Sequence, residues 1–91
     1  MRRQIESAKI VDAFLEIEEK VAYRLRTKGR GVYASPHEAE GIIDEEHDEL
    51  VDELRANDRE RFRAELIDIA VACVIAMASD NGQWDWLEEA P

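Results

Sequence analysis

Two pairs of acidic residues are spaced three residues apart, which places both members of each pair on one face of a helix. The first pair is Glu46 and Glu49, and the second is Glu65 and Asp68 within "AELIDIAVACVIAM". The second segment is apolar on nearly every side, and such a helix is normally buried all round. Carboxylates on it are costly unless something pairs with them. These acids therefore need a partner, either a cation or a basic side chain.

The elements that must position these acids are predicted to be three helices. Apolar residues recur in steps of three and four at Ile10, Phe14, Ile17, Val21 and Leu25, which predicts a helix over about 4–26. Gly29 and Gly31 then make a loop. No alternation typical of strands and no repeat is found, so the fold class is all-α, as a single domain over 1–91.

Capping signals set the bounds of the other two helices. Ser35, Pro36 and Glu38 in "SPHE" form an N-cap, a first-turn proline and a capping box, which start a helix over about 36–56. "ND" at 57–58 supplies a turn and the next N-cap, and a third helix follows over about 59–79. Gly82 is expected to end that helix as the C′ residue. A short tail over 83–91 offers Trp84, Trp86 and Leu87 as anchors.

The predicted helices bring the two acid pairs together. A short turn makes the second and third helices antiparallel neighbours. Glu46 and Glu49 flank a core face of the second helix made by Ala39, Ile43, Leu50 and Leu54, whereas Asp44, Asp48 and Asp52 fall on a solvated side, and His47 also points away. Glu65 and Asp68 share their face with small residues. Four converging carboxylates repel one another unless cations neutralise them, and oxygen-only ligands suit Mg²⁺ or Mn²⁺.

Basic residues offer alternatives to this interpretation. Arg24 or Arg26 from the first helix could pair with the buried acids in place of a metal ion. Together with Lys28 and Arg30, they also form a candidate phosphate clamp. The competing interpretation is a helix C-terminus that carries favourable positive charge. Asp80 and Asn81 follow the third helix, either as polar substrate contacts or simply as its end.

Composition narrows the class of partner. The chain has 22 acids against 12 bases, a formal net charge of −10, which argues against nucleic acid or an anionic membrane as the main partner.

The single cysteine, Cys73, is interpreted as a small core residue in a reducing compartment. No signal-peptide pattern or long apolar stretch is found, so a cytoplasmic location is expected. A chain of 91 residues has little core of its own, which favours assembly with further copies.

The pattern of acids also resembles a known family. "SPHEAEGIIDEEHDELVDEL" followed by "AELIDIAVACVIAM" is similar to the MazG-like branch of the all-α nucleotide pyrophosphohydrolases, whose motif is E-E-x-x-E, a spacer and E-x-x-D. The resemblance covers about residues 5–82. It implies a Mg²⁺-dependent enzyme that cleaves nucleoside triphosphates to monophosphates and pyrophosphate, working as a homodimer or homotetramer with a shared helical bundle.

Carried onto this sequence, the resemblance implies roles for five acids. Glu46, Glu49, Glu65 and Asp68 would be metal ligands, and Glu45 would be a further ligand or would orient the attacking water. Arg24, Lys28, Arg30, Asp80 and Asn81 are the candidate substrate contacts. A phosphoribosyl-ATP pyrophosphatase is disfavoured because "EGIIDEE" contains no lysine. The remaining alternative is a non-catalytic dimerisation or regulatory module with a vestigial metal site.

Overall fold

Three helices form the fold in the computed structural model, which describes residues 1–80, 82 and 84. They are α1 (Ser7–Lys28), α2 (Pro36–Arg55) and α3 (Arg59–Ser79). The described residues contain no strand, so the all-α prediction is confirmed. The predictions for Asn81, Trp86 and Leu87 concern residues outside this range.

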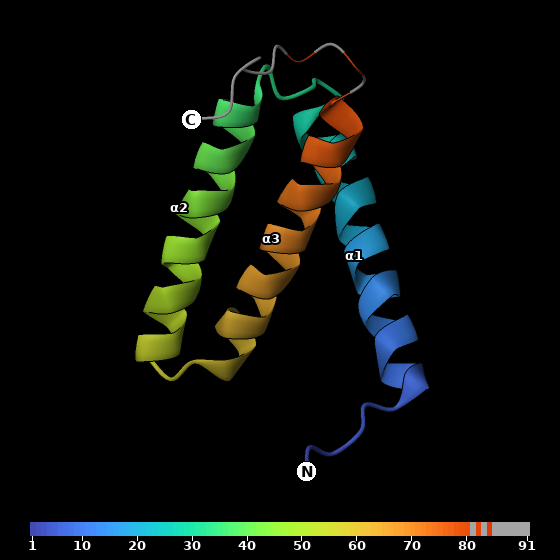
Figure 1. The fold of residues 1–91 in the computed structure, drawn as a ribbon, viewed down its shortest axis with the longest axis vertical. Coiled ribbons are helices and arrows are strands. Elements are labelled where there is room, and N and C mark those ends of the chain that lie inside the picture. Colours follow the sequence, from blue (N-terminus) through green and yellow to red (C-terminus); the bar gives the residue numbers. More distant parts are fainter. Residues whose placement is uncertain (81, 83, 85–91) are drawn as a thin grey trace.

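The helices lie in a row, with α3 between α2 and α1 (Figure 1). Helix α3 packs on both neighbours, whereas α1 and α2 do not pack on each other. Helix α2 runs antiparallel to α3, and α1 runs in the same direction as α3. Among the three described helices, α3 therefore has a neighbouring helix on two sides.

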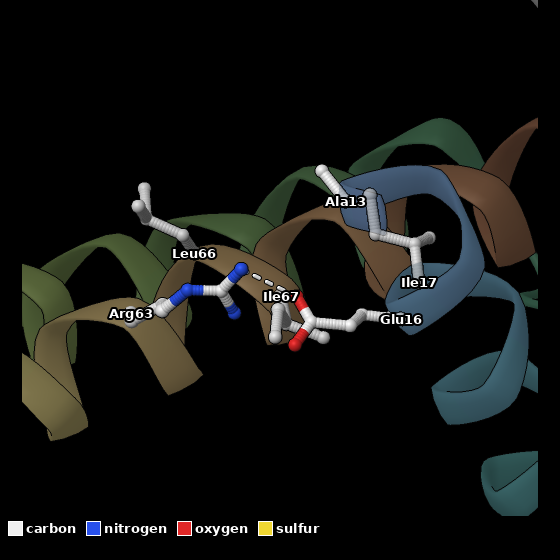
Figure 2. Close-up of a pocket in the computed structure, with 6 residues that line it drawn as sticks. All are labelled: Ala13, Glu16, Ile17, Arg63, Leu66 and Ile67. Atoms are coloured by element: carbon white, nitrogen blue, oxygen red, sulfur yellow. Dashed lines mark ion pairs between the residues drawn. The ribbon is translucent and has the colours of Figure 1, made fainter. Parts of the chain in front are cut away.

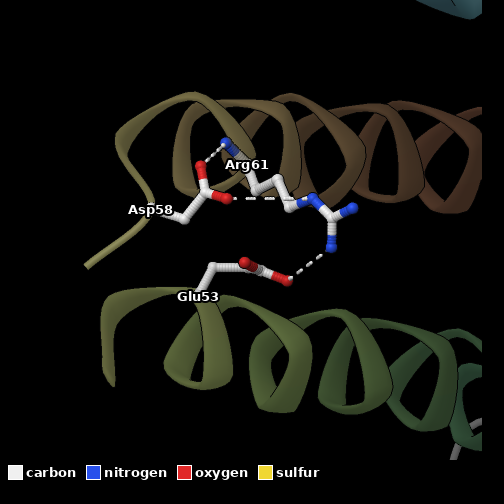
Figure 3. A network of polar contacts seen from close by, with 3 residues as sticks. All are labelled: Glu53, Asp58 and Arg61. Atoms are coloured by element: carbon white, nitrogen blue, oxygen red, sulfur yellow. Dashed lines mark hydrogen bonds and ion pairs between the residues drawn. The ribbon is translucent and has the colours of Figure 1, made fainter. Parts of the chain in front are cut away.

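The turn between α2 and α3 is built as the sequence predicts. Asn57 adopts a left-handed φ of 56°, and the amides of Asn57 and Asp58 donate to the carbonyls of Leu54 and Glu53, both at 3.1 Å. This is the Schellman arrangement, which satisfies the last carbonyls of a helix. The Asp58 carboxylate then accepts from the Arg61 amide at 3.0 Å. Figure 3 shows how the Arg61 side chain also reaches Asp58 and Glu53.

The predicted N-cap and first-turn proline of α2 are confirmed as well. The Ser35 hydroxyl accepts from the Glu38 amide at 3.1 Å, and Pro36 is the first helical residue. The end of α2 is Arg55, one residue before the expected bound, because Ala56 is the C-cap.

The bounds of α1 differ from those predicted. The helix begins at Ser7 rather than at residue 4, because Glu6 is an extended N-cap whose carbonyl accepts from the Lys9 amide at 3.0 Å. It continues past the apolar stripe to Lys28, where Gly29 ends it at a φ of +85°. Glycine adopts this conformation without strain.

The predicted role of Gly82 is wrong. Helix α3 ends at Ser79 with Asp80 as its C-cap, so Gly82 lies two residues beyond the cap. Gly82 does adopt a φ of +77°, but it belongs to the segment after the helix end rather than to the C′ position.

The core is small and lies close to the C-terminal end of α1 and the N-terminal end of α2. It consists of Tyr33, Ala39, Val71 and Ile75, with Val21, Leu25, Ile42 and Trp84 packed around them. The Tyr33 amide donates to the Ser79 hydroxyl at 3.0 Å, and Trp84 Nε1 donates to the Tyr33 carbonyl at 2.9 Å. The burial of Tyr33, two residues after Gly31, is not predictable from a local sequence pattern. Leu54, expected in the core face, is exposed.

No helix among the described residues is both long and apolar enough to cross a membrane. Helix α1 contains no buried residue at all. The apolar stripe that predicted α1 is therefore only partly covered by its own chain.

Candidate metal centre

Three of the four predicted ligands converge in the contact between α2 and α3. One carboxylate oxygen from each of Glu46, Glu49 and Glu65 lies within 4.8 Å of the other two. Glu46 and Glu49 are one turn apart on α2, and the tight turn at Asn57 brings α3 back alongside them. The convergence follows from the i, i+3 spacing together with the antiparallel packing.

The burial of these carboxylates is uneven. Glu46 and Glu65 are partly buried, whereas Glu49 is exposed. The Oε2 atoms of Glu46 and Glu65 are both buried without a hydrogen-bond partner. Buried polar atoms in native proteins are nearly always satisfied, by protein, water or an ion. The site therefore has two buried acceptor oxygens that still need a donor or a cation.

The pKa values of the two buried acids are displaced in the same direction. Burial raises the pKa of Glu65 to about 7, and the contact with Glu46 and the charges of Glu49 and Asp68 act in the same sense. Burial also raises the pKa of Glu46, an effect that its contact with Glu65 partly offsets. The two groups titrate as a pair that holds a proton more readily than isolated acids do. A proton bound to this pair reduces the negative charge of the cluster, as a bound cation would.

Asp68 lies beside this cluster rather than within it. It is partly buried on α3, and its charge contributes to the raised pKa of both Glu46 and Glu65. Its oxygens are not among those that meet within 4.8 Å. Glu45 is exposed and is also absent from the cluster, because a step of one residue turns its side chain about 100° away from that of Glu46.

The arginine alternative is not realised in the described part of the chain. No ion pair there joins Arg24 or Arg26 to Glu65 or Asp68. Arg24 instead donates to the Gly29 carbonyl at 3.1 Å, and its guanidinium lies 5.8 Å from the centre of the Tyr33 ring. Arg24 thus closes the loop after α1.

The candidate substrate contacts lie near the C-terminal ends of α1 and α3, away from the acids. Arg24 and Arg30 line a hollow of about 220 Å³ that also includes Ile75 and Ser79. Ile75 and Ser79 follow Glu65 by 10 and 14 residues, which corresponds to about 15–20 Å along α3. Lys28 and Asp80 are exposed at the same end. One chain therefore does not bring these residues to the acids.

A second group of possible ligands was not predicted. Oxygen and nitrogen atoms of Asp44, His47 and Asp48 also lie within 4.8 Å of one another, but all three residues are exposed. Their spacing along α2 is visible in the sequence, where they were assigned to a solvated face. Their exposure agrees with that assignment.

The donor set at the buried cluster fits a hard divalent cation. Glu46, Glu49 and Glu65 supply only oxygen atoms, and two of those atoms are orphaned. Mg²⁺ and Mn²⁺ prefer such ligands and retain several waters, for which the exposed side at Glu49 leaves room. A scan against protein-family models finds no match for this chain, and searches of curated proteins and of solved structures find none either.

Proposed function

We propose that this chain is a Mg²⁺- or Mn²⁺-dependent nucleoside triphosphate pyrophosphohydrolase that cleaves (d)NTP to (d)NMP and pyrophosphate. The observation that supports the proposal is the cluster of Glu46, Glu49 and Glu65, in which two buried carboxylate oxygens lack a partner. The reaction itself is taken from the resemblance of the acid motif, and the cluster provides a chemically suitable place for it.

Each acid has a distinct role in the proposal. Glu46 and Glu65 would anchor the cation from the buried side, and Glu49 would hold it from the solvent side, where a triphosphate can approach. Asp68 adds negative charge beside them. Glu45 is adjacent to Glu46 in the sequence, but its side chain points away from the cluster. It would orient the attacking water or act as an additional ligand. When bound, the cation neutralises phosphate charge and lowers the pKa of a bound water.

Access to the site is compatible with a large anionic substrate. The cluster includes one exposed member, so a phosphate chain can reach it without opening the core. The net charge of −10 opposes the approach of a free triphosphate. A divalent cation bound to the acids or to the nucleotide would reduce this electrostatic repulsion near the site.

Release of pyrophosphate from a panel of nucleoside and deoxynucleoside triphosphates, with and without Mg²⁺, tests the proposal. Glu49→Gln should reduce kcat by at least about 100-fold, since it removes a charged ligand at the metal. Glu40→Gln is the matched control, because Glu40 is an exposed glutamate on the same helix outside the cluster. Equal activity of the two variants, or no Mg²⁺-dependent release in the wild type, would contradict the proposal.

One observation favours a second candidate, a non-catalytic homo-oligomeric module with a vestigial metal site. Arg24 and Arg30, which would hold substrate phosphates, line a hollow beside Ile75 and Ser79, and these two residues follow Glu65 by about 15–20 Å along α3. A module of this kind would still bind Mg²⁺ at Glu46, Glu49 and Glu65, but would release no pyrophosphate from any nucleotide in the panel.

A further inference from the structure

The hollow of about 220 Å³ near the C-terminal ends of α1 and α3, hereafter the arginine hollow, combines positive charge with apolar walls. Among the described residues that line it, only Arg24 and Arg30 are charged. The apolar walls come from both helices and from the loop after α1, and they include Val21, Leu25, Val32, Val74 and Ile75. A concave site that is mostly apolar, with a few charged groups at one side, is the usual form of a small-molecule site.

Neither arginine of this hollow is neutralised within the described part of the chain. The ion pairs there involve Arg61 and Arg63, and none includes Arg24 or Arg30. The hollow farther along α1 and α3 differs, because its Arg63 is paired with Glu16 (Figure 2). On a chain with a net charge of −10, two cations without an acidic partner are available to a bound anion.

Arg24 is held in position before any ligand binds. Its guanidinium donates to the Gly29 carbonyl at 3.1 Å and lies 5.8 Å from the centre of the Tyr33 ring. A guanidinium carries several N–H donors, so this bond leaves most of them for a carboxylate. A side chain that is already ordered loses little further entropy when it binds a ligand.

The volume of the arginine hollow limits the size of the ligand. A dry cavity of roughly 150 Å³ holds benzene, so 220 Å³ at the same packing takes about nine non-hydrogen atoms. A ring or a branched aliphatic group with one carboxylate has this size. Val32 and Val74, which are 65% and 39% exposed, are the apolar side chains that such a ligand would cover.

The same walls are poorly suited to a phosphate chain. The Ser79 hydroxyl accepts from the Tyr33 amide at 3.0 Å and donates its own hydrogen to the Ile75 carbonyl at 2.7 Å, so it has no donor left for an anion. A strongly hydrated phosphate chain against aliphatic side chains would lose water contacts that nothing there replaces. The charge and the walls therefore favour an anion with one acidic group and an apolar body.

We infer that the arginine hollow binds a small organic monoanion, an aryl or branched aliphatic carboxylate of about nine non-hydrogen atoms. Its carboxylate would lie between Arg24 and Arg30, and its apolar body would pack on Val74 and Ile75. Ile75 follows Glu65 by about 15 Å along α3, so this site is separate from the acid cluster and does not depend on the proposed reaction.

Titration of the isotope-labelled full chain with benzoate, followed by NMR of the backbone amides in metal-free buffer of low ionic strength, tests this inference. The amides of Gly31, Val32 and Ser79 should shift, with a dissociation constant on the order of 1 mM. Benzamide has the same shape without the charge, and acetate has the same charge without the ring. Each should bind at least about tenfold more weakly than benzoate.

A pair of arginine variants assigns the binding to this hollow. Arg30→Gln should raise the dissociation constant for benzoate about tenfold, since it removes one charge-assisted contact. Arg26→Gln is the matched control, because Arg26 is an exposed arginine in the last turn of α1 that does not line the hollow. It should bind benzoate as the wild type does.

Several results would overturn the inference. Benzoate that shifts none of these amides, benzamide or acetate that binds as tightly as benzoate, or Arg30→Gln with an unchanged constant would each do so. Inorganic pyrophosphate is the last probe, and tighter binding of pyrophosphate than of benzoate at these amides would make the hollow a phosphate clamp instead. Because neither metal nor nucleotide is present, all of these outcomes are independent of the proposed function.

Discussion

At the scale of single residues, Glu65 concentrates the chemistry of the candidate site. Its Oε2 atom is buried without a partner, and burial together with Glu46, Glu49 and Asp68 raises its pKa to about 7. A carboxyl group with this pKa is neutral below pH 7, and a bound cation would favour its ionised form. The same residue therefore links the stability of the fold to pH and, if the proposed site binds a cation, to metal as well.

The stability of the metal-free protein should fall as the pH rises from about 4.5 to 7. The folded state holds the Glu65 proton over this interval, whereas the unfolded state, with a pKa near 4.5, has released it. Folding therefore binds a proton, and the free energy of unfolding decreases with increasing pH until the folded group has ionised. The raised pKa of Glu46 acts in the same direction.

Urea denaturation in chelator at several pH values measures this dependence. Glu65→Gln should flatten the curve between pH 4.5 and 7 and should make the metal-free protein more stable than the wild type at pH 8. Glu40→Gln, the exposed control, should retain the wild-type slope. A wild-type stability that rises with pH over this interval would show that Glu65 is stabilised as an anion.

At the scale of the elements, the sequence was informative wherever local chemistry decides the structure. Ser35, Pro36 and Asp58 act at the helix starts where capping rules place them. The end of α1 differs from the prediction because the helix continues beyond its apolar stripe. The backbone leaves the helical conformation only at Gly29. The burial of Tyr33 depends on Ser79 and Trp84, 46 and 51 residues away. No local pattern contains such contacts.

The same distinction applies to the site. Glu46, Glu49 and Glu65 were predictable because i, i+3 spacing and a short turn fix their relative positions. The distance of Arg24 and Arg30 from the acids was not, since it depends on α1 and α3 running in the same direction (Figure 1). Clustering of charge along the sequence says nothing about that direction.

Removal of the Ser35 cap should destabilise α2 measurably. Its hydroxyl accepts from the Glu38 amide, and loss of such a cap costs about 1 kcal/mol. Chemical denaturation of Ser35→Ala in chelator should show this loss. Ser7→Ala is the control, because Ser7 is exposed at the start of a helix whose N-cap is Glu6, and it should change stability by less than about 0.5 kcal/mol. Equal effects would mean that the cap contributes nothing specific.

At the scale of the whole molecule, α3 separates two surfaces with different chemistry. Toward α2 it presents Glu65 to the acid cluster, and toward α1 it contributes Leu66 and Ile67 to a hollow that Ala13 and Ile17 also line. Among the described residues no large side chain is fully buried, so binding at either surface should add stability to the fold.

The melting temperature with and without Mg²⁺, at one fixed protein concentration, tests the central claim that Glu46, Glu49 and Glu65 hold a divalent cation. Saturation at about 100 times the dissociation constant adds about 2.7 kcal/mol per site, which corresponds to a rise of roughly 10 °C or more in a domain of this size. The wild type and Asp48→Asn should both show this rise, because Asp48 belongs to the exposed group on the outer side of α2. Glu65→Gln should lose most of it while melting higher than the wild type in chelator. A wild-type melting temperature that neither Mg²⁺ nor Mn²⁺ changes, or an equal shift in Glu65→Gln, would contradict the claim.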